Sequence, residues 1–485
     1  MSLLETLTND GHTQLFIGGQ WRESGDGRRI DVLDPSNAES LAAVASGGEA
    51  DARDAVEAAS SAQESWRATS PQERSTILSR AFSIMIERRD ELAELIVQEM
   101  GKALSEAVGE VTYSAEFFRW YSGEAVRNSG SLGDSPGRDK KIVAIHQPVG
   151  VSLLITPWNF PLAMATRKIG PAVAAGCTMI LKPASDTPLS ALAVARILAE
   201  AGLPDGVLNV MPSNRSSTVV PTILSDDRVR LVSFTGSTEV GRGLLAEAAK
   251  TVVNASMELG GNAPFVVFDD ADIDAAVAGA MIAKMRNGGQ SCIAANRILV
   301  HEAVASDFTT RLSEAMHSLK VGPGLEAGVE LGPLINQGAQ DDMAESVALS
   351  LGSGSVLSTG GDVGRSPGFY FEPTVISDVQ PGDPILQREV FGPIAPIITF
   401  TSDDEAISMA NDTIYGLASY VYTEDLARGM RTAEAIDAGM VGLNRGLISD
   451  PAAPFGGTKQ SGVGREGGHE GMMEFLETKY IAANW

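Results

Sequence analysis

The chain has few cysteines and no long hydrophobic run. Only 2 of its 485 residues are cysteine, which is too few for a disulfide framework and favours a reduced, cytosolic protein. The longest apolar runs, such as VGVSLLI and APFVVF, are far shorter than the ~20 residues that a transmembrane helix needs. These two absences argue against a disulfide-stapled secreted domain and predict no membrane partner.

Positive charge is also scarce. Lys and Arg number 37 against 62 Asp and Glu, so the net charge is −25. Such an excess of negative charge opposes binding to nucleic acids and to anionic membrane surfaces, and neither is expected as a partner. The composition, with 44% hydrophobic and 20% charged residues, is typical of a globular protein. The length exceeds what one hydrophobic core usually serves, so two or three domains are expected.

Two hydrophobic periods alternate along the chain. Apolar residues three and four apart predict helices at 51–66, 72–100, 187–202, 239–251, 272–286 and 302–318. Short runs rich in β-branched residues predict strands at 150–157, 177–183, 229–236, 263–269 and 416–423. Strands alternating with helices are typical of doubly wound parallel sheets. The sequence therefore predicts two α/β domains.

Two segments fall outside this alternation. Residues 125–140 are polar and rich in Gly, Ser and Pro, and they lead into the strand-like KIVAIHQPVG. The C-terminal LETKYIAANW is a solitary strand-like segment. A lone strand needs a sheet edge to pair with, in this chain or in a neighbouring one.

One of the two cysteines stands in an unusual setting. Cys177, in AAGCTMILKPA, lies beside a predicted strand, and buried thiols of this kind usually behave as small core hydrophobes. Cys292 instead follows GGQS, where small and polar residues provide little for a core to hold. A thiol that attacks a substrate needs open space and nearby N–H groups. Cys292 is therefore the candidate nucleophile.

Six motifs share one order and spacing with a known family. They are ITPWNFP (155–161), LKPAS (181–185), FTGSTEVG (234–241), MELGGNAP (257–264), GGQSC (288–292) and EVFGP (389–393). Together they resemble the aldehyde dehydrogenase superfamily over essentially the whole chain. Within it, the succinate-semialdehyde dehydrogenase branch is most similar, through TRKIG, KMRNGGQSC and GLISDPAAPFGGTKQSGVGREG.

This resemblance implies a fold and an assembly. A Rossmann-like dinucleotide-binding domain is expected from residues 1–126 and 147–258. An α/β catalytic domain is expected from 259–465, and a small β oligomerisation arm from 127–146 and 470–485. The arm would pair between subunits and form homodimers or homotetramers.

The chemistry of aldehyde oxidation assigns roles to three residues. A thiolate adds to the carbonyl, hydride then leaves to a nicotinamide, and water cleaves the resulting thioester. The resemblance implies Cys292 as nucleophile, with its backbone N–H and the Asn159 side-chain amide as donors to the oxyanion. An amide suits this task because it donates without titrating. Glu258, expected just after an apolar-leaning helix, is implied as the deacylation base, with a pKa raised by partial burial.

The cofactor residues lie outside the common dinucleotide fingerprints. FTGSTEVG predicts a turn from a strand to a helix, and helix N-termini receive phosphates, yet it matches neither G-x-G-x-x-G nor a Walker loop. The resemblance places the pyrophosphate at Gly236 and Ser237, the nicotinamide near Trp158 and Leu259, and its ribose at Glu389 with Phe391 alongside. No metal site is expected.

Lys182 and Ser185 bear on the choice between NAD and NADP. Branches that prefer NAD often carry Glu at the position of Ser185, where it would repel a 2′-phosphate. Serine removes that repulsion, and Lys182 adds a cation. The prediction is that NADP is preferred and NAD is possible.

Three further residues suggest the substrate. A carboxylate at the far end of a small aldehyde calls for arginine. Arg286 precedes Cys292 by six residues, and Arg167 follows Asn159 by eight. These two arginines, with Ser449, match the positions that hold the substrate carboxylate in the resembling branch. Succinic semialdehyde is therefore the expected substrate.

The chain also departs from the family pattern. Many members of the branch carry a second cysteine two residues after the nucleophile, but here Ala294 stands in that place. A disulfide switch between near neighbours is therefore excluded, and oxidative sensitivity would come from Cys292 alone. Arg445 is a second departure, and the sequence leaves open whether it assists the substrate or pairs with an acid.

Three alternatives stay open at this point. Glutarate semialdehyde is one methylene longer, which changes binding by only ~1–3 kcal/mol. A thiol esterase could use Cys292, Asn159 and Glu258 without net oxidation, although the cofactor residues argue against that as the main role. A catalytically silent structural protein is disfavoured because all three residues are present.

Overall fold

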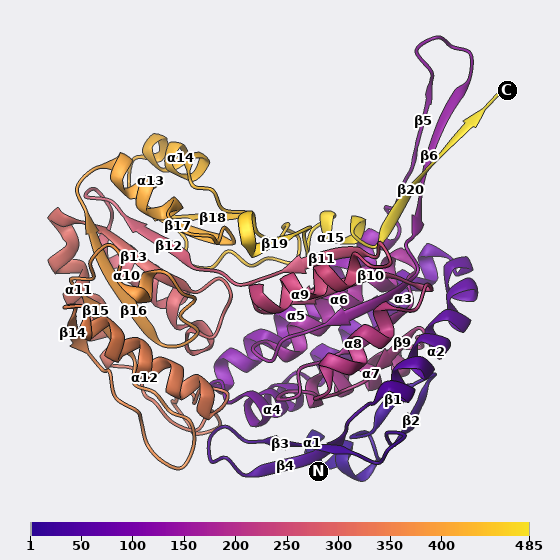
Figure 1. Ribbon diagram of the computed structural model, residues 1–485, viewed down its shortest axis with the longest axis horizontal. Coiled ribbons are helices and arrows are strands. Elements are labelled where there is room, and N and C mark those ends of the chain that lie inside the picture. Colours follow the sequence, from indigo (N-terminus) through magenta and orange to yellow (C-terminus); the bar gives the residue numbers. More distant parts are fainter. Residues whose placement is uncertain (1, 485) are drawn as a thin grey trace.

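The computed structural model describes residues 2–484. Two lobes, each a sheet covered by helices, lie side by side, and a narrow arm projects from one of them (Figure 1). The two α/β sheets predicted from the sequence are confirmed. None of the helices in the described part is long and apolar enough to cross a membrane.

The first lobe contains an eight-stranded sheet in the order β19-β11-β10-β7-β8-β9-β1-β2. Its strands are β1 (Leu15–Ile17), β2 (Gln20–Arg22), β7 (Val151–Ile155), β8 (Met179–Lys182), β9 (Leu208–Val210), β10 (Val229–Thr235), β11 (Asn254–Glu258) and β19 (Gly462–Val463). Its helices are α1 (Leu3–Asn9), α2 (Glu49–Ala68), α3 (Pro71–Glu87), α4 (Arg89–Met100), α5 (Leu104–Ala125), α6 (Pro161–Ala175), α7 (Leu189–Ala201), α8 (Ser216–Leu224) and α9 (Thr238–Ala248). A hairpin of β3 (Arg29–Leu33) and β4 (Ser40–Ala45) lies beside it.

The second lobe contains a seven-stranded sheet in the order β14-β15-β16-β13-β12-β17-β18. Its strands are β12 (Ala263–Val267), β13 (Ala295–His301), β14 (Val356–Thr359), β15 (Thr374–Ser377), β16 (Ile394–Phe400), β17 (Ala418–Tyr422) and β18 (Met440–Leu443). Its helices are α10 (Ile273–Met285), α11 (Glu302–His317), α12 (Gln337–Gly352), α13 (Asp403–Asn411) and α14 (Leu426–Ala435), with short 3₁₀ turns η1 (Arg286–Gly289) and η2 (Pro384–Leu386). The turn η3 (Lys459–Ser461) and α15 (Glu470–Met473) lead back to the first lobe.

The register of the first sheet brings several motifs to one edge. Strands β7, β8, β10 and β11 are parallel, so their carboxyl ends meet at the same side of the sheet. Ile155 pairs with Phe234 and with Lys182, and Thr235 pairs with Glu258. The segments after these strands therefore converge, although they are far apart in the sequence.

Two local expectations were wrong. The helix expected at 72–100 is two helices, because Arg88 leaves helical geometry at φ −102° and ψ 21°. Both helices bury an apolar face, so the spacing of apolar residues in the sequence stays helical across the break. Glu258 does not follow a helix; it is the last residue of β11, a strand whose inner half is buried.

The arm is a three-stranded antiparallel sheet. It contains β5 (Ser131–Asp134), β6 (Lys141–Pro148) and β20 (Leu476–Ala483). The C-terminal strand pairs within its own chain, along β6 from Leu476–Pro148 to Ala483–Lys141. Figure 1 shows this ribbon standing away from the first lobe, next to the C-terminus. Large apolar side chains remain exposed on it, namely Leu132, Tyr480 and Ile481.

Candidate active site

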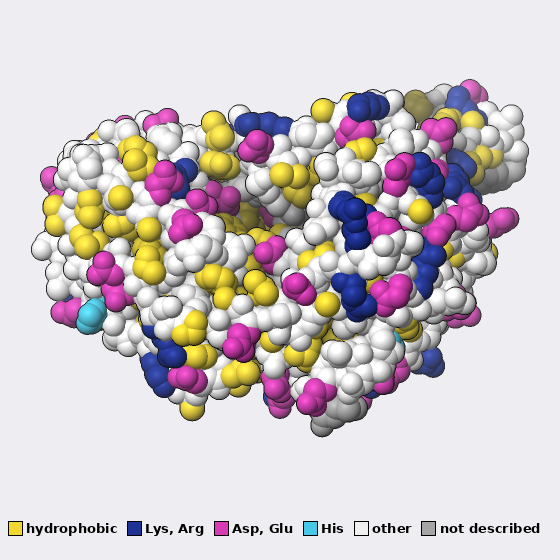
Figure 2. Space-filling view, turned by 60° about the horizontal axis from the view of Figure 1, so that its bottom comes forward, with side chains coloured by type: hydrophobic (Ala, Val, Ile, Leu, Met, Phe, Trp, Pro, Cys, Tyr) yellow, Lys and Arg dark blue, Asp and Glu magenta, His cyan; other side chains and the backbone are white. Residues whose placement is uncertain are grey.

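A cavity of about 230 Å³ collects most of the residues predicted for the site. Those that line it are Trp158, Asn159, Arg167, Gly236, Ser237, Leu259, Arg286, Cys292, Glu389, Phe391 and Ser449. Three predicted residues do not line it, namely Lys182, Ser185 and Glu258. The lining comes from both lobes, and Figure 2 shows a recess between the lobes on one face of the molecule.

A sharp turn presents Cys292 to this cavity. Asn287, Gly288 and Gly289 have positive φ of 56°, 62° and 76°, a conformation that glycine and asparagine tolerate best. A Cβ at Gly289 would lie 2.1 Å from the carbonyl oxygen of Gly392, so no larger residue fits there. Burial raises the pKa of the half-buried Cys292 thiol well above its usual range, and the Glu258 carboxylate adds to the shift. The free protein therefore holds a neutral thiol at pH 7.

The second cysteine is in a different environment. Cys177 is fully buried and donates to the carbonyl oxygen of Phe475 at 3.3 Å. Burial raises the pKa of its thiol to about 11. The thiol is packed in the core of the first lobe, in agreement with its interpretation as a core residue.

Glu258 lies beside the cavity, at the end of β11. Its side chain is 3% exposed, and the Arg167 guanidinium is its nearest cation, at 3.8 Å. Neither carboxylate oxygen has a hydrogen-bond partner among the described residues. Burial raises the pKa of Glu258 to about 8, although Arg167 opposes the shift. A carboxyl group with this pKa is matched to proton transfer near neutral pH.

Asn159 follows β7 and is held on both sides. Its Nδ2 donates to the carbonyl oxygen of Gln290 at 3.1 Å, and its Oδ1 accepts from the backbone N–H of Phe160 at 3.1 Å. An amide nitrogen carries two hydrogens. One joins Asn159 to the loop that carries Cys292, and the other remains for a substrate oxygen in the cavity that Asn159 lines.

The three helices that follow β7, β8 and β10 differ at their N-termini. Glu110 accepts from the first N–H groups of α6 at 3.0 and 3.3 Å, and Glu99 accepts from those of α7 at 2.8 and 2.9 Å. These buried carboxylates occupy the positions that a phosphate would take. Helix α9 has only its own Ser237 as N-cap, which leaves it open toward the cavity.

The residues near α9 form one side of the cavity. Glu389 accepts from the backbone N–H of Gly261 at 3.0 Å, and burial raises the pKa of its carboxyl to about 7. Trp158 and Phe391 meet edge to face at 5.5 Å. A Cβ at Gly260 would lie 2.9 Å from Glu389 Oε2, so glycine keeps the carboxylate in place.

Lys182 and Ser185 lie outside the cavity lining, the first as the last residue of β8 and the second just after it. Lys182 is buried and contacts the carbonyl oxygen of Pro183 at 3.4 Å, and burial lowers the pKa of its ammonium to about 8. Ser185 is half-buried and donates to Asp186 Oδ2 at 3.4 Å. Both lie at the carboxyl end of β8, the sheet edge at which the cavity residues also lie, but neither lines the cavity.

The two arginines line the cavity in different settings. Arg167 Nε contacts Glu466 Oε2 at 2.5 Å, and its guanidinium lies 4.3 Å from the centre of the Phe455 ring. Arg286 lies over the rings of Phe160 and Tyr113, at 4.7 and 5.7 Å. It forms no ion pair within residues 2–484. A free cation therefore faces the same cavity as the thiol.

Two residues at or near the cavity were not predicted from the sequence. Tyr113, on α5, shares hydrogen bonds with Arg167 and Ser449, and burial raises the pKa of its phenol. Glu466 pairs with both Arg167 and Lys168. No motif marks Tyr113, since α5 reads as an ordinary amphipathic helix, and Glu466 lies in the segment GVGREG, which gives no sign that its carboxylate meets Arg167. Arg445 is exposed and donates to the carbonyl oxygen of Leu447 at 2.6 Å, away from the cavity lining.

Comparison with known proteins agrees with this geometry. The model of the aldehyde dehydrogenase family matches residues 21–481. A succinate-semialdehyde dehydrogenase of Paenarthrobacter nicotinovorans is 54% identical over 91% of this chain and 98% of its own. A glutarate-semialdehyde dehydrogenase of Pseudomonas aeruginosa is 48% identical over 96% and 97%. The crystal structure of an Escherichia coli NADP-dependent enzyme has a TM-score of 0.97 at 45% identity, covering 99% of both chains. The chain belongs to the aldehyde dehydrogenase family.

Proposed function

We propose that this enzyme oxidises succinic semialdehyde to succinate with NADP, and with NAD less efficiently. The observation that carries the proposal is the pairing of Cys292 with an unpaired Arg286 in one cavity. A thiol captures the aldehyde carbon, while a guanidinium takes a carboxylate. A succinate-semialdehyde dehydrogenase of Escherichia coli whose name specifies NADP is 46% identical over 96% of this chain.

The first half of the reaction belongs to Cys292 and Asn159. The thiol passes its proton to a water molecule as its sulfur adds to the aldehyde carbon, because its raised pKa keeps it neutral beforehand. The carbonyl oxygen becomes an oxyanion, which the free N–H of the Asn159 amide and the Cys292 backbone N–H stabilise. Collapse of this thiohemiacetal expels a hydride and leaves a thioester on Cys292.

Glu258 acts in the second half of the reaction, the hydrolysis of the thioester. Its carboxylate lies outside the cavity lining and near Arg167, so it must rotate from the end of β11 to reach the thioester. With a pKa of about 8 it exists in both protonation states near neutral pH. Its deprotonated form takes a proton from water, the hydroxide attacks the thioester, and the carboxylic acid leaves while Cys292 regains its proton.

The residues near α9 fit a nicotinamide dinucleotide. Thr235 lines the cavity with a buried hydroxyl that has no partner among the described residues, so a ligand atom is needed to satisfy it. Gly236 and Ser237 lie at a helix start that no carboxylate caps, and Glu389 offers a carboxylate to ribose hydroxyls. When bound, the nicotinamide supplies the acceptor for the two electrons that leave the substrate.

The preference for NADP rests on charge. Ser185 places no carboxylate of its own against a 2′-phosphate, and Lys182 carries a buried cation nearby. A phosphate beside Lys182 would restore the stability of its ammonium form. Asp186 brings a carboxylate close to this position, because it accepts a hydrogen bond from Ser185. To avoid repelling the 2′-phosphate, it must turn away or keep its hydrogen bond from Asn336 at 3.3 Å. The preference for NADP should therefore be moderate.

Substrate choice rests on Arg286 first and on Arg167 and Ser449 second. Arg286 forms no ion pair among residues 2–484 and feels the Glu106 carboxylate only at longer range, whereas Arg167 is partly neutralised by Glu466. Glutarate semialdehyde is the second candidate, because one methylene changes binding little and a relative at 48% identity carries that name. The esterase alternative finds no support among the relatives.

The proposal extends to the assembly. The domain division at 1–126 with 147–258, 259–465, and 127–146 with 470–485 remains an inference, to which we add that β19 joins the first sheet by pairing with β11. The exposed apolar residues of the arm, Leu132, Tyr480 and Ile481, support a homodimer or homotetramer. A cytosolic location follows from the low cysteine content.

The deciding experiment follows absorbance at 340 nm with succinic semialdehyde, glutarate semialdehyde and butanal, each with NADP and with NAD. The expected order of kcat/KM is succinic semialdehyde, then glutarate semialdehyde, then butanal, with NADP above NAD for all three. Equal values for butanal and succinic semialdehyde would refute the carboxylate anchor. A clear preference for NAD would refute the role given to Lys182 and Ser185.

A further inference from the structure

A buried ionic cluster lies behind the proposed oxyanion amide, outside the cavity. It consists of Lys102, just before α5, Glu106 and Glu110 on α5, and Asn287 in η1, and it is called the Lys102 cluster below. The side chains of Lys102 and Glu110 are both 0% exposed, and they pair at 2.5 Å. Placing two charges in the interior costs free energy unless further hydrogen bonds compensate. The other hydrogen bonds of these groups must therefore offset that cost.

The remaining contacts converge on one backbone atom. Lys102 Nζ donates to the carbonyl oxygen of Asn159 at 2.9 Å, and Asn287 Nδ2 donates to the same oxygen at 2.8 Å. Lys102 Nζ also lies 4.0 Å from the centre of the Phe160 ring. The Asn159 carbonyl oxygen thus accepts two hydrogen bonds, one from a donor in each lobe. Together they fix the plane of the peptide bond between Asn159 and Phe160.

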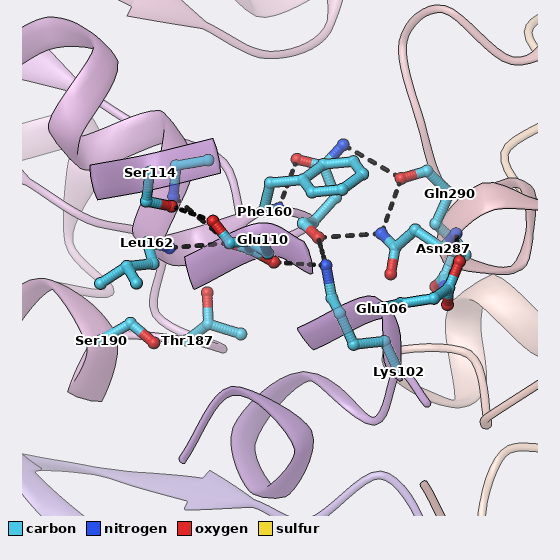
Figure 3. Close-up of polar contacts among 12 residues, drawn as sticks. Lys102, Glu106, Glu110, Ser114, Phe160, Leu162, Thr187, Ser190, Asn287 and Gln290 are labelled. Carbon is cyan, nitrogen blue, oxygen red and sulfur yellow. Dashed lines mark hydrogen bonds and ion pairs between the residues drawn. The ribbon is translucent and has the colours of Figure 1, made fainter. Parts of the chain in front are cut away.

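The second lobe is tied to the same point. Glu106 accepts from the backbone N–H of Asn287 at 2.6 Å, directly after Arg286. Asn287 Nδ2 and Asn159 Nδ2 both contact the carbonyl oxygen of Gln290, at 3.0 and 3.1 Å. Figure 3 shows Glu106 beside Asn287 and Gln290, with Glu110 on the opposite side of the Lys102 ammonium. The cluster links the oxyanion turn in the first lobe to the loop of Arg286 and Cys292 in the second.

We propose that Lys102 and Asn287 are positioning residues that hold the Asn159 amide in register with Cys292. Neither lines the cavity, so neither touches the aldehyde. Glu110 accepts a hydrogen bond from Lys102 and caps α6 through the backbone N–H groups of Leu162 and Ala163. The inference rests on the proposed role of Asn159, because a misplaced amide harms the reaction only if that amide stabilises the oxyanion. An error of about 1 Å in such a donor can cost ~10²-fold in rate.

The test uses a double variant that removes both members of the buried Lys102–Glu110 ion pair, while Glu106 keeps its hydrogen bond from the Asn287 backbone N–H. Lys102→Met with Glu110→Gln keeps an oxygen acceptor for the start of α6. The expected result is a ~10–100-fold loss of kcat on succinic semialdehyde and on butanal alike, with the KM for NADP within about threefold, because the displaced amide serves every aldehyde. Glu99→Gln is the matched control, since Glu99 caps α7 in the same way and is not bonded to Asn159. Its kcat should change less than twofold.

A double-mutant cycle separates positioning from general damage. In an Asn159→Ala background the Lys102→Met, Glu110→Gln pair should cost less than about twofold, because the group it positions is gone. The same fold-loss in both backgrounds would overturn the proposal, as would a comparable loss in Glu99→Gln. If Asn159→Ala alone left kcat unchanged, the proposed oxyanion role itself would fail, which is a different outcome.

A second variant keeps the test usable if the double variant does not fold. Asn287→Gly removes the side-chain donors, and its φ of 56° is well tolerated by glycine. It should lower kcat ~3–10-fold on both aldehydes at unchanged melting temperature, and this loss should also vanish in the Asn159→Ala background. An unchanged kcat would overturn the positioning role of Asn287.

Discussion

Arg167 and Arg286 line one cavity, but their surroundings make them different tools. Arg167 comes from α6 and is held by Glu466, with Glu258 at 3.8 Å. Arg286 comes from η1 and rests on two aromatic rings. An arginine already paired with carboxylates mainly sets the charge of its neighbours, whereas one resting on rings can still pair with a substrate anion. Residue type and position in the cavity therefore do not suffice to assign an arginine to substrate binding.

The largest expected effect removes the atom that both arginines surround. Cys292→Ala should lower kcat with every aldehyde by ~10⁴-fold or more, because no other nucleophile is present. Cys177→Ala is the matched control and should keep kcat near the wild-type value, since that thiol is buried in the core. Undiminished reduction of NADP by Cys292→Ala, followed at 340 nm, would remove the basis of the comparison.

Arg286→Ala should separate the arginines most clearly. Charge-assisted hydrogen bonds contribute about 1.5–3 kcal/mol, so kcat/KM for succinic semialdehyde should fall ~10–100-fold. Butanal, which has no carboxylate, should lose less than about threefold. Steady-state kinetics with both aldehydes decide the matter. Equal losses would show that Arg286 acts on the structure of the loop and not on the substrate charge.

The pH profile tests the carboxylate beside Arg167. Glu258 acts as a base only when deprotonated, so turnover should rise with pH through about 8. For a single group of this pKa the rise from pH 7 to pH 9 is ~10-fold. Glu258→Gln should be slow and should lose this limb. A profile that is flat between pH 7 and pH 9 in the wild type would contradict the assignment of Glu258 as the base.

The smallest expected change in activity comes from replacing Arg167, the arginine paired with Glu466. Arg167→Lys keeps a cation for Glu466 but holds it less rigidly near Glu258. Because Arg167 lowers the pKa of Glu258, the basic limb should move upward and kcat at pH 7.5 should fall a few-fold for butanal and succinic semialdehyde alike. A loss confined to succinic semialdehyde would instead place Arg167 on the substrate carboxylate, as the sequence alone suggested.

Much of the fold could be anticipated from local pattern. Alternating strand and helix signals predicted two α/β sheets, and a solitary C-terminal run predicted the arm strand β20. The break at Arg88 could not be foreseen, since α3 and α4 each keep an apolar face across it. The strand β11, which ends in Glu258, was not foreseen, because its five residues NASME are a short segment just after the helix predicted at 239–251.

The candidate site divides in the same way. Cys292, Asn159 and Glu389 stand within distinctive motifs, and each lines the cavity. Tyr113 and the Lys102 cluster were not foreseen, because their partners are brought near only by packing of α5 against α6 and against the loop of η1. A polar residue on an amphipathic helix gives no local sign of what it will face.

By itself, the sequence determined the chemistry available: one thiol among small residues, an amide, a carboxyl group and two arginines at set intervals from them. Only the tertiary structure decided how each is tuned, because burial and charged neighbours act through space and not along the chain. Packing buries Glu258 and raises its pKa to about 8, places Glu466 on Arg167, and leaves Arg286 free. Those three outcomes turn a set of reactive groups into a site for an anionic aldehyde.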